Sequence, residues 1–291
     1  MIYKIENGKI IVTDKSQFNP EHILECGQVF RFGKDENNNY FVMSKNHKAT
    51  IIETDTNYEI ICDDVNYFIN YFDLETDYNI AKTHLSKFEI LKPMIEFGYG
   101  IRILNGDPLE IIFSYTISQN NNIKRIQQII ERLCELSLSK TSPKHFPTIE
   151  ELNAAPLSFY SSLGAGYRDK FLKDLSESLL NVDLNEISKL STDELYNYLL
   201  SFKGIGPKVA SCILLFGFSR REKFPVDTWL EQVYYNHFSK EKRTRPEIQK
   251  YFENEFGEFS GIAQQYLFYY ERSKKAQKNK GWALIFILIN K

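Results

Sequence analysis

The sequence has 291 residues and a mass of 34.2 kDa, enough for two domains, and its 43% hydrophobic and 25% charged residues exclude a disordered chain. Its four cysteines lie far apart and include no Cys-x-x-Cys pair, so we expect no metal site, no cofactor and no disulfide framework. The first residues show no signal-peptide pattern, and no apolar run reaches the roughly 18 residues that span a bilayer. We therefore expect a cytoplasmic protein with no membrane partner.

Charge is distributed unevenly along the chain. The formal net charge is −2, but residues 1–100 contain 10 basic and 16 acidic residues, whereas residues 201–250 contain 10 basic and 5 acidic residues. A basic face in the C-terminal half would bind a polyanion locally. An uneven but solvated surface explains the same counts equally well.

Residues 1 to about 65 predict an antiparallel sheet. Asn7-Gly8 separates two apolar stretches, and this dipeptide favours a tight hairpin because both residues tolerate positive φ. Further β-rich stretches follow with short connections, which suit antiparallel pairing. The predicted strands are residues 2–5, 9–12, 29–32, 40–43, 50–52 and 58–62.

From about residue 67 the apolar residues follow a helical period. Asp107 can cap a helix that begins at Pro108. Apolar residues between 123 and 136 keep the i, i+3, i+7 spacing of an amphipathic helix. Residues 148–151 and 191–194 both match the capping box that marks a helix start.

The sequence thus predicts an α+β protein with an N-terminal antiparallel β domain, residues 1–98, and a mostly helical domain, residues 99–291. A lysine-rich run at residues 274–280 precedes apolar residues 282–289. This apolar stretch is too short to span a membrane. We expect it to be a last packed segment rather than a lipid anchor.

A helical hairpin is predicted at about residues 193–217. Gly204 and Gly206 favour a tight turn, and Pro207 suits the first turn of a second helix. This is the helix-hairpin-helix pattern, in which glycines without side chains let a DNA phosphate approach the amides of the second helix. Such a site binds DNA without recognising its base sequence. An ordinary pair of helices joined by a glycine turn would explain the glycines equally well.

Two residues near this hairpin could carry chemistry. Lys208 lies in the first turn of the second helix, and Asp227 precedes a further apolar-periodic stretch. A lysine amine in a dry cleft can act as a nucleophile, and a carboxylate can stabilise a cationic sugar centre. The ordinary alternatives are a surface lysine and a helix cap.

The hairpin together with Pro225-Val226-Asp227 resembles the helix-hairpin-helix/Gly-Pro-Asp superfamily of base-excision DNA glycosylases, and most closely its 8-oxoguanine DNA glycosylase/AP lyases. Four further segments resemble motifs of that family, in order along the chain. They are Cys-Gly-Gln-Val-Phe-Arg-Phe at residues 26–32, Ser-Gln-Asn-Asn-Asn-Ile-Lys-Arg-Ile at 118–126, Leu-Gly-Ala-Gly-Tyr-Arg at 163–168 and Gly-Ile-Ala-Gln-Gln-Tyr-Leu-Phe at 261–268.

The resemblance implies a β domain with two helical lobes and an active site in their cleft. It implies that Lys208 attacks C1′ of the lesion nucleoside, forms a Schiff base and nicks the strand by β-elimination, while Asp227 helps to expel the base. The base must first leave the duplex. The implied contacts of the lesion base are the Gly27 carbonyl to N7–H, Gln264 to the Watson–Crick edge, and Phe268 and Cys212 on its two faces.

The same resemblance implies residues for the opposite strand. Asn120, Arg125 and Arg168 would surround the unpaired cytosine, and Tyr167 would fill or wedge near the vacated site. The expected partner is double-stranded DNA containing oxidised guanine, so the protein would associate with a bacterial or archaeal nucleoid through DNA. We expect it to act as a monomer.

Each of these residues also has an ordinary interpretation. Phe268 and Tyr167 would otherwise be core aromatics, and Cys212, four residues after Lys208, a small buried hydrophobe. Gln28 and Arg31 are interpreted as structural.

The chain departs from eukaryotic members at Trp229, where they carry histidine, which puts contacts around the lesion's phosphate in doubt. Alternative functions are a glycosylase for another damaged purine, such as an alkylated one, and a helix-hairpin-helix protein that binds DNA without catalysis.

Overall fold

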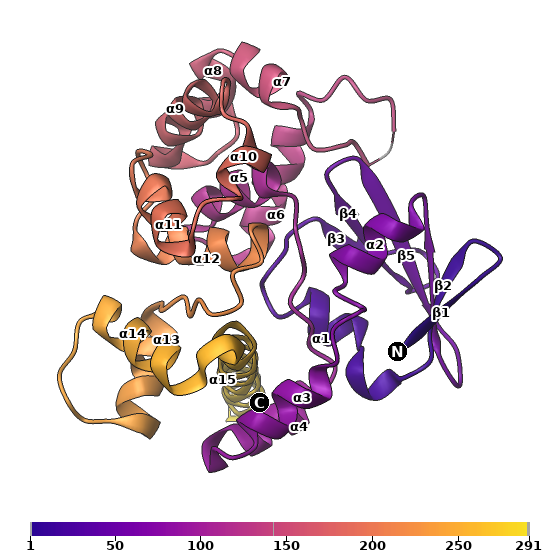
Figure 1. The fold of residues 1–291 in the computed structure, drawn as a ribbon, viewed down its shortest axis with the longest axis vertical. Helices are drawn as coiled ribbons and strands as arrows, with labels where there is room; N and C mark the ends of the chain where they lie inside the picture. Colours follow the sequence, from indigo (N-terminus) through magenta and orange to yellow (C-terminus); the bar gives the residue numbers. More distant parts are fainter. Residues whose placement is uncertain (1, 142, 290–291) are drawn as a thin grey trace.

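The computed structural model describes residues 2–141 and 143–289, with side chains as far as Lys274. A six-stranded sheet lies at one side of the molecule, and helices form the rest (Figure 1). The strands are β1 (Tyr3–Glu6), β2 (Lys9–Val12), β3 (Phe32–Lys34), β4 (Tyr40–Ser44), β5 (His47–Glu53) and β6 (Tyr58–Cys62). The predicted α+β class is therefore confirmed.

The sheet is antiparallel throughout, in the order β1-β2-β6-β5-β4-β3. Alternate residues such as Ile10 and Ile60, which pair directly, are fully buried on one face, whereas Ile61 is 41% exposed on the other. The β1–β2 turn has positive φ at Asn7 and Gly8, as the hairpin prediction requires.

One strand prediction was wrong in position. Strand β3 begins at Phe32 rather than at Val29, because Val29 and Phe30 turn into the core and Phe30 packs edge-on against Tyr115 at 5.7 Å. Gly27, with φ +90°, sets the direction of this segment.

The helices form two lobes beside the sheet (Figure 1). The sheet region carries α1 (Pro20–Leu24) and α2 (Val65–Tyr71). One lobe contains α5 (Pro108–Ser118), α6 (Ile123–Cys134), α7 (Ile149–Ala154), α8 (Leu157–Ser162), α9 (Asp169–Leu179), α10 (Leu184–Ile187), α11 (Thr192–Leu200) and α12 (Pro207–Gly217). The other contains α3 (Tyr78–Leu85), α4 (Lys92–Phe97), α13 (Thr228–Val233), α14 (Arg245–Phe256) and α15 (Ser260–Ile289).

The second lobe combines both ends of the chain. Helix α4, which precedes the boundary proposed at residue 98, packs against C-terminal α15. Among the described residues no helix is long and apolar enough to cross a membrane. The backbone of α15 continues to Ile289, but the predicted packing of residues 282–289 falls outside the described side chains.

Buried polar contacts join the sheet region to the first helical lobe. Arg31 forms an ion pair with Glu110 of α5 at 3.0 Å, with both side chains less than 10% exposed. The Gln28 side chain donates to the Arg102 carbonyl at 2.8 Å and accepts from the Leu104 amide at 2.9 Å. These contacts confirm that Arg31 and Gln28 are structural.

Candidate active site

The predicted helical hairpin is present, as α11 followed by a glycine turn and α12 (Figure 1). The two glycines of the turn have different structural roles. Gly204 has φ +85°, and a Cβ there would lie 2.5 Å from the Phe171 ring, so this residue is required by backbone conformation and packing. Gly206 is the N-cap of α12, and a Cβ there would meet nothing within 4 Å. A side chain at Gly206 would therefore project into open space at the start of α12.

The charges of Lys208 and Asp227 both act on the pKa of one buried thiol, that of Cys212. Lys208, in the first turn of α12, lies with its amine 5.3 Å from the centre of the Tyr115 ring. Burial raises the pKa of the Cys212 thiol, and the nearby Lys208 charge lowers it while that of Asp227 raises it. Because burial dominates, Cys212 is a neutral thiol at neutral pH and a poor competing nucleophile.

Asp227 has the capping role that its position predicts. It is the N-cap of α13, and its Oδ1 accepts hydrogen bonds from the Trp229 amide at 2.9 Å and the Leu230 amide at 3.0 Å. These contacts orient the carboxylate at a helix start, where the dipole favours a negative charge. Capping and a catalytic role are compatible, because both need the same fixed orientation.

The predicted base-binding residues Gly27 and Phe268 are neighbours although they are far apart in sequence. A Cβ on Gly27 would lie 3.2 Å from Cε1 of Phe268. The Tyr115 hydroxyl lies 3.4 Å from the Gly27 carbonyl and 3.2 Å from the Gln28 carbonyl, so its single proton serves two acceptors. A carbonyl has two lone pairs, so Gly27 can accept a further hydrogen bond.

Gln264 lies one helical turn before Phe268 on α15, which places the two on the same helix face. Its side chain is buried, and its Oε1 accepts a hydrogen bond from Nε2 of Gln265 at 2.8 Å. This contact fixes the amide orientation of Gln264, so its Nε2 is the group left to donate.

The four residues predicted for the opposite strand form a second cluster. The Arg125 side chain is exposed and donates to the Gly164 carbonyl at 2.9 Å. Asn120, with φ +44°, lies with its Nδ2 3.5 Å from the Tyr167 hydroxyl, and Tyr167 is 55% exposed. Arg168, by contrast, is only 3% exposed, stacks on Tyr167 and donates to the carbonyls of Gln119, Asn120 and Ala165.

The three exposed members of this cluster, Asn120, Arg125 and Tyr167, can meet a ligand directly. Arg168 instead holds the Asn120 loop in its left-handed conformation.

Sequence analysis missed two residues that connect these clusters. Tyr115 touches Lys208 through its ring and the Gly27 turn through its hydroxyl. Gln119 donates from its side chain to the Gly204 carbonyl at 2.9 Å and accepts from Arg168 with its backbone carbonyl. Tyr115 lies inside α5 and Gln119 directly follows its end, and neither residue type has a sequence pattern that would indicate such contacts.

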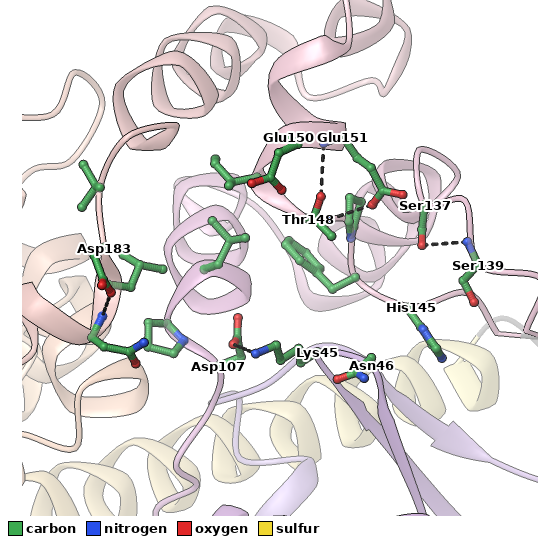
Figure 2. A pocket seen from close by; sticks show the side chains of 18 residues that line it. Lys45, Asn46, Asp107, Ser137, Ser139, His145, Thr148, Glu150, Glu151 and Asp183 are labelled. Atoms are coloured by element: carbon green, nitrogen blue, oxygen red, sulfur yellow. Dashed lines mark hydrogen bonds and ion pairs between the residues drawn. The ribbon is translucent and has the colours of Figure 1, made fainter.

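A cavity of about 780 Å³ lies elsewhere, between the β4–β5 turn, the α6–α7 loop and α10 (Figure 2). Its carboxylates already serve as caps: Asp107, Glu151 and Asp183 accept hydrogen bonds from backbone amides at the starts of α5, α7 and α10. None of the predicted site residues lines it. The size of this cavity therefore gives no reason to move the candidate site.

The chain is similar to known DNA glycosylase/lyases. Residues 10–112 match a family model described as the N-terminal domain of 8-oxoguanine DNA glycosylase. An N-glycosylase/DNA lyase of Saccharomyces cerevisiae is 28% identical over 275 residues, covering 80% of this chain and 71% of the relative. A probable N-glycosylase/DNA lyase of Methanothermobacter thermautotrophicus is 29% identical over 228 residues, covering 69% of this chain and 72% of the relative.

A solved structure gives a fuller match. It is the Clostridium acetobutylicum 8-oxoguanine glycosylase/lyase in complex with double-stranded DNA containing cytosine opposite to 8-oxoG. It is 33% identical, with a TM-score of 0.87, and the match covers 94% of this chain and all of that chain.

The six-stranded sheet with two helical lobes and the sequence identity to this structure define the class of protein as a DNA glycosylase/lyase of base-excision repair. The chain belongs to the 8-oxoguanine DNA glycosylase/lyase family.

Proposed function

We propose that the protein excises 8-oxoguanine through a Schiff base on Lys208 and then nicks the strand by β-elimination. The unprotonated amine attacks C1′, the bond from C1′ to the base breaks, and its electron pair leaves with the base, which takes up a proton. Asp227 stabilises the positive charge that develops at the sugar. The attacking nitrogen loses a proton, the C1′–O4′ bond of the sugar opens, O4′ takes up a proton and the nitrogen lone pair forms the protonated imine at C1′. This imine allows loss of a C2′ proton, and the electron pair left behind expels the 3′ phosphate.

The observations that support this proposal are the Lys208 amine over the Tyr115 ring in the first turn of α12 and the Asp227 carboxylate fixed at the N-cap of α13. The charges of both residues also act on the pKa of the buried Cys212 thiol. A protein that only binds DNA needs the hairpin but not an amine and a carboxylate at consecutive helix starts. Because burial raises the pKa of the Cys212 thiol, this thiol is a poor competitor for the nucleophilic role proposed for Lys208.

Lesion recognition is proposed for the corner between Gly27 and Phe268. 8-Oxoguanine carries a proton on N7 that guanine lacks, and the Gly27 carbonyl has a lone pair to accept it. Phe268 and Cys212 would lie against the two faces of the base. The Nε2 group of Gln264 would donate to its Watson–Crick edge.

We further propose that the lesion is processed faster opposite cytosine than opposite adenine. The exposed guanidinium of Arg125 and the amide of Asn120 can donate to N3 and O2 of cytosine, and adenine offers no matching pair of acceptors. One chain contains every residue invoked here, and we propose that it acts as a monomer on double-stranded DNA.

The test is covalent trapping of the whole protein. Incubation with a duplex containing 8-oxoguanine opposite cytosine, followed by borohydride, should give a covalent protein–DNA adduct, whereas the undamaged duplex should give none. No adduct on any damaged duplex would indicate a binding protein. An adduct on a duplex with an alkylated purine, but none with 8-oxoguanine, would indicate the other glycosylase activity.

A further inference from the structure

Arg272 of α15 contacts the segment around Gly27, and the proposed chemistry does not use it. Its Nη2 donates a hydrogen bond to the carbonyl of Glu25, a residue 247 positions away in the sequence. Its guanidinium also lies over the Phe268 ring, 5.6 Å from the ring centre. One side chain therefore touches both walls of the proposed base-binding corner.

The corner is tight on the Gly27 side. A Cβ on Gly27 would lie 3.0 Å from Nη1 of Arg272 and 3.2 Å from Cε1 of Phe268. Gly27 also has φ +90°, so its conformation excludes most side chains. The Gly27 backbone, the Phe268 ring and the Arg272 guanidinium thus lie so close together that there is little room for a side chain at residue 27.

Stability alone does not account for Arg272. Within the described residues, its Nη1 is buried without a hydrogen-bond partner, which costs free energy. A shorter apolar side chain would avoid that cost. A guanidinium is explained if its role is to fix the distance between the Gly27 turn and the Phe268 ring, because it contacts both sides.

We propose that Arg272 is a positioning residue that sets the distance between the Gly27 carbonyl and the Phe268 ring, and thereby the selectivity for 8-oxoguanine over guanine. This inference rests on the proposed function. A hydrogen bond from N7–H weakens steeply as its length and angle depart from the optimum. With the base lying against Phe268, a shift of the Gly27 turn would remove the one contact that separates the two bases.

The experiment compares two reactions of the same protein. Excision of 8-oxoguanine needs a base in the corner, whereas cleavage of a duplex with a preformed abasic site needs only Lys208. Arg272→Met should slow single-turnover excision by at least about tenfold, because misplacement by about 1 Å can cost up to about 100-fold. Cleavage of the abasic duplex should stay within about twofold of the unaltered protein.

Two further variants separate positioning from general stability. Arg272→Lys should recover part of the excision rate, since an ammonium group can still donate to the Glu25 carbonyl and lie over Phe268. Lys274→Met is the matched control, because Lys274 lies over the Tyr270 ring on the same helix and away from Gly27. It should leave both reactions unchanged.

Equal losses of excision and abasic cleavage in Arg272→Met would show a merely structural residue and overturn the inference. Unchanged excision in that variant would overturn it as well. Failure of the unaltered protein to excise 8-oxoguanine, with or without abasic cleavage, would instead overturn the proposed function on which the inference rests.

Discussion

The Lys208 amine lies over the Tyr115 ring, and its charge lowers the pKa of the nearby Cys212 thiol. Burial raises the pKa of both neighbours and favours their neutral forms. We predict that Lys208→Gln abolishes borohydride trapping and strand nicking, because the amide cannot form an imine. Affinity for a lesion-containing duplex should stay within about threefold, since Gly206 and the α12 amides remain. Trapping assays with a gel-shift titration check both expectations. Retained trapping would show that another amine does the chemistry.

Asp227 caps helix α13 and also carries a negative charge, and one substitution separates the effects of these two properties. Asparagine caps helices as well as aspartate does, so Asp227→Asn should leave the thermal unfolding midpoint nearly unchanged. The excision rate should fall by about 10²–10³-fold, as for removal of one electrostatic group from a transition state. Single-turnover kinetics measure this fall. A loss below about threefold would reduce Asp227 to a helix cap.

The two arginines of the opposite-strand cluster should behave differently. Arg125 is exposed, so Arg125→Ala should preserve stability while reducing the preference for cytosine over adenine, which we expect to be at least about tenfold in the unaltered protein. Arg168→Ala removes a buried side chain that binds three carbonyls, so it should also lower the unfolding midpoint. Excision rates of both variants, measured with each of the four bases opposite the lesion, test these expectations. A uniform loss of rate in both variants would mean that neither arginine reads the base.

At the level of elements, the hairpin turn allows a matched pair of substitutions. Gly204→Ala should destabilise the fold by about 1–3 kcal/mol, because it combines positive φ with a clash against Phe171. Gly206→Ala has neither problem and should unfold like the unaltered protein, yet its methyl group would occupy the space where we expect the phosphate. Denaturant unfolding and DNA titration of both variants test this. Weak DNA binding with normal stability in Gly206→Ala is the decisive result.

Sequence patterns located the elements better than the contacts between them. The capping boxes at Thr148 and Ser191 are present with both reciprocal hydrogen bonds, because such signals act within one helical turn. The strand predicted at residues 29–32 was misplaced because burial of Phe30 against Tyr115 outweighed its β propensity. The proximity of Gly27 and Phe268, and the bridge through Gln119, depend on packing between distant segments, which no local pattern contains.

For the whole molecule, His22 joins three segments and should make stability depend on pH. Its ring lies between Tyr99 and Tyr269, and its Nδ1 accepts a hydrogen bond from the Gly100 amide. Burial lowers the pKa of His22 from 6.5 to about 4. Between these values the unfolded chain binds the proton and the folded chain does not, so the free energy of unfolding should fall as pH drops from 6.5 to 4.

Denaturant unfolding at pH 7 and pH 5 measures this dependence. His22→Gln should show a weaker loss of stability between the two pH values than the unaltered protein, because glutamine does not titrate. His145→Gln, at the rim of the large cavity, is the control and should keep the original dependence. Identical pH dependence in all three proteins would show that His22 does not contribute.

The contact between Arg272 and Glu25 also bears on biosynthesis. It spans 247 positions, so during translation the hairpin and Lys208 emerge from the ribosome before the chain segment that closes the base-binding corner. Contacts of such long range form late, because a large loop must first be closed. A nascent chain that ends before α15 would therefore present the turn proposed to bind phosphate without the corner proposed to select the base. Completion of the C-terminal helix would thus convert a general DNA-binding surface into a selective enzyme.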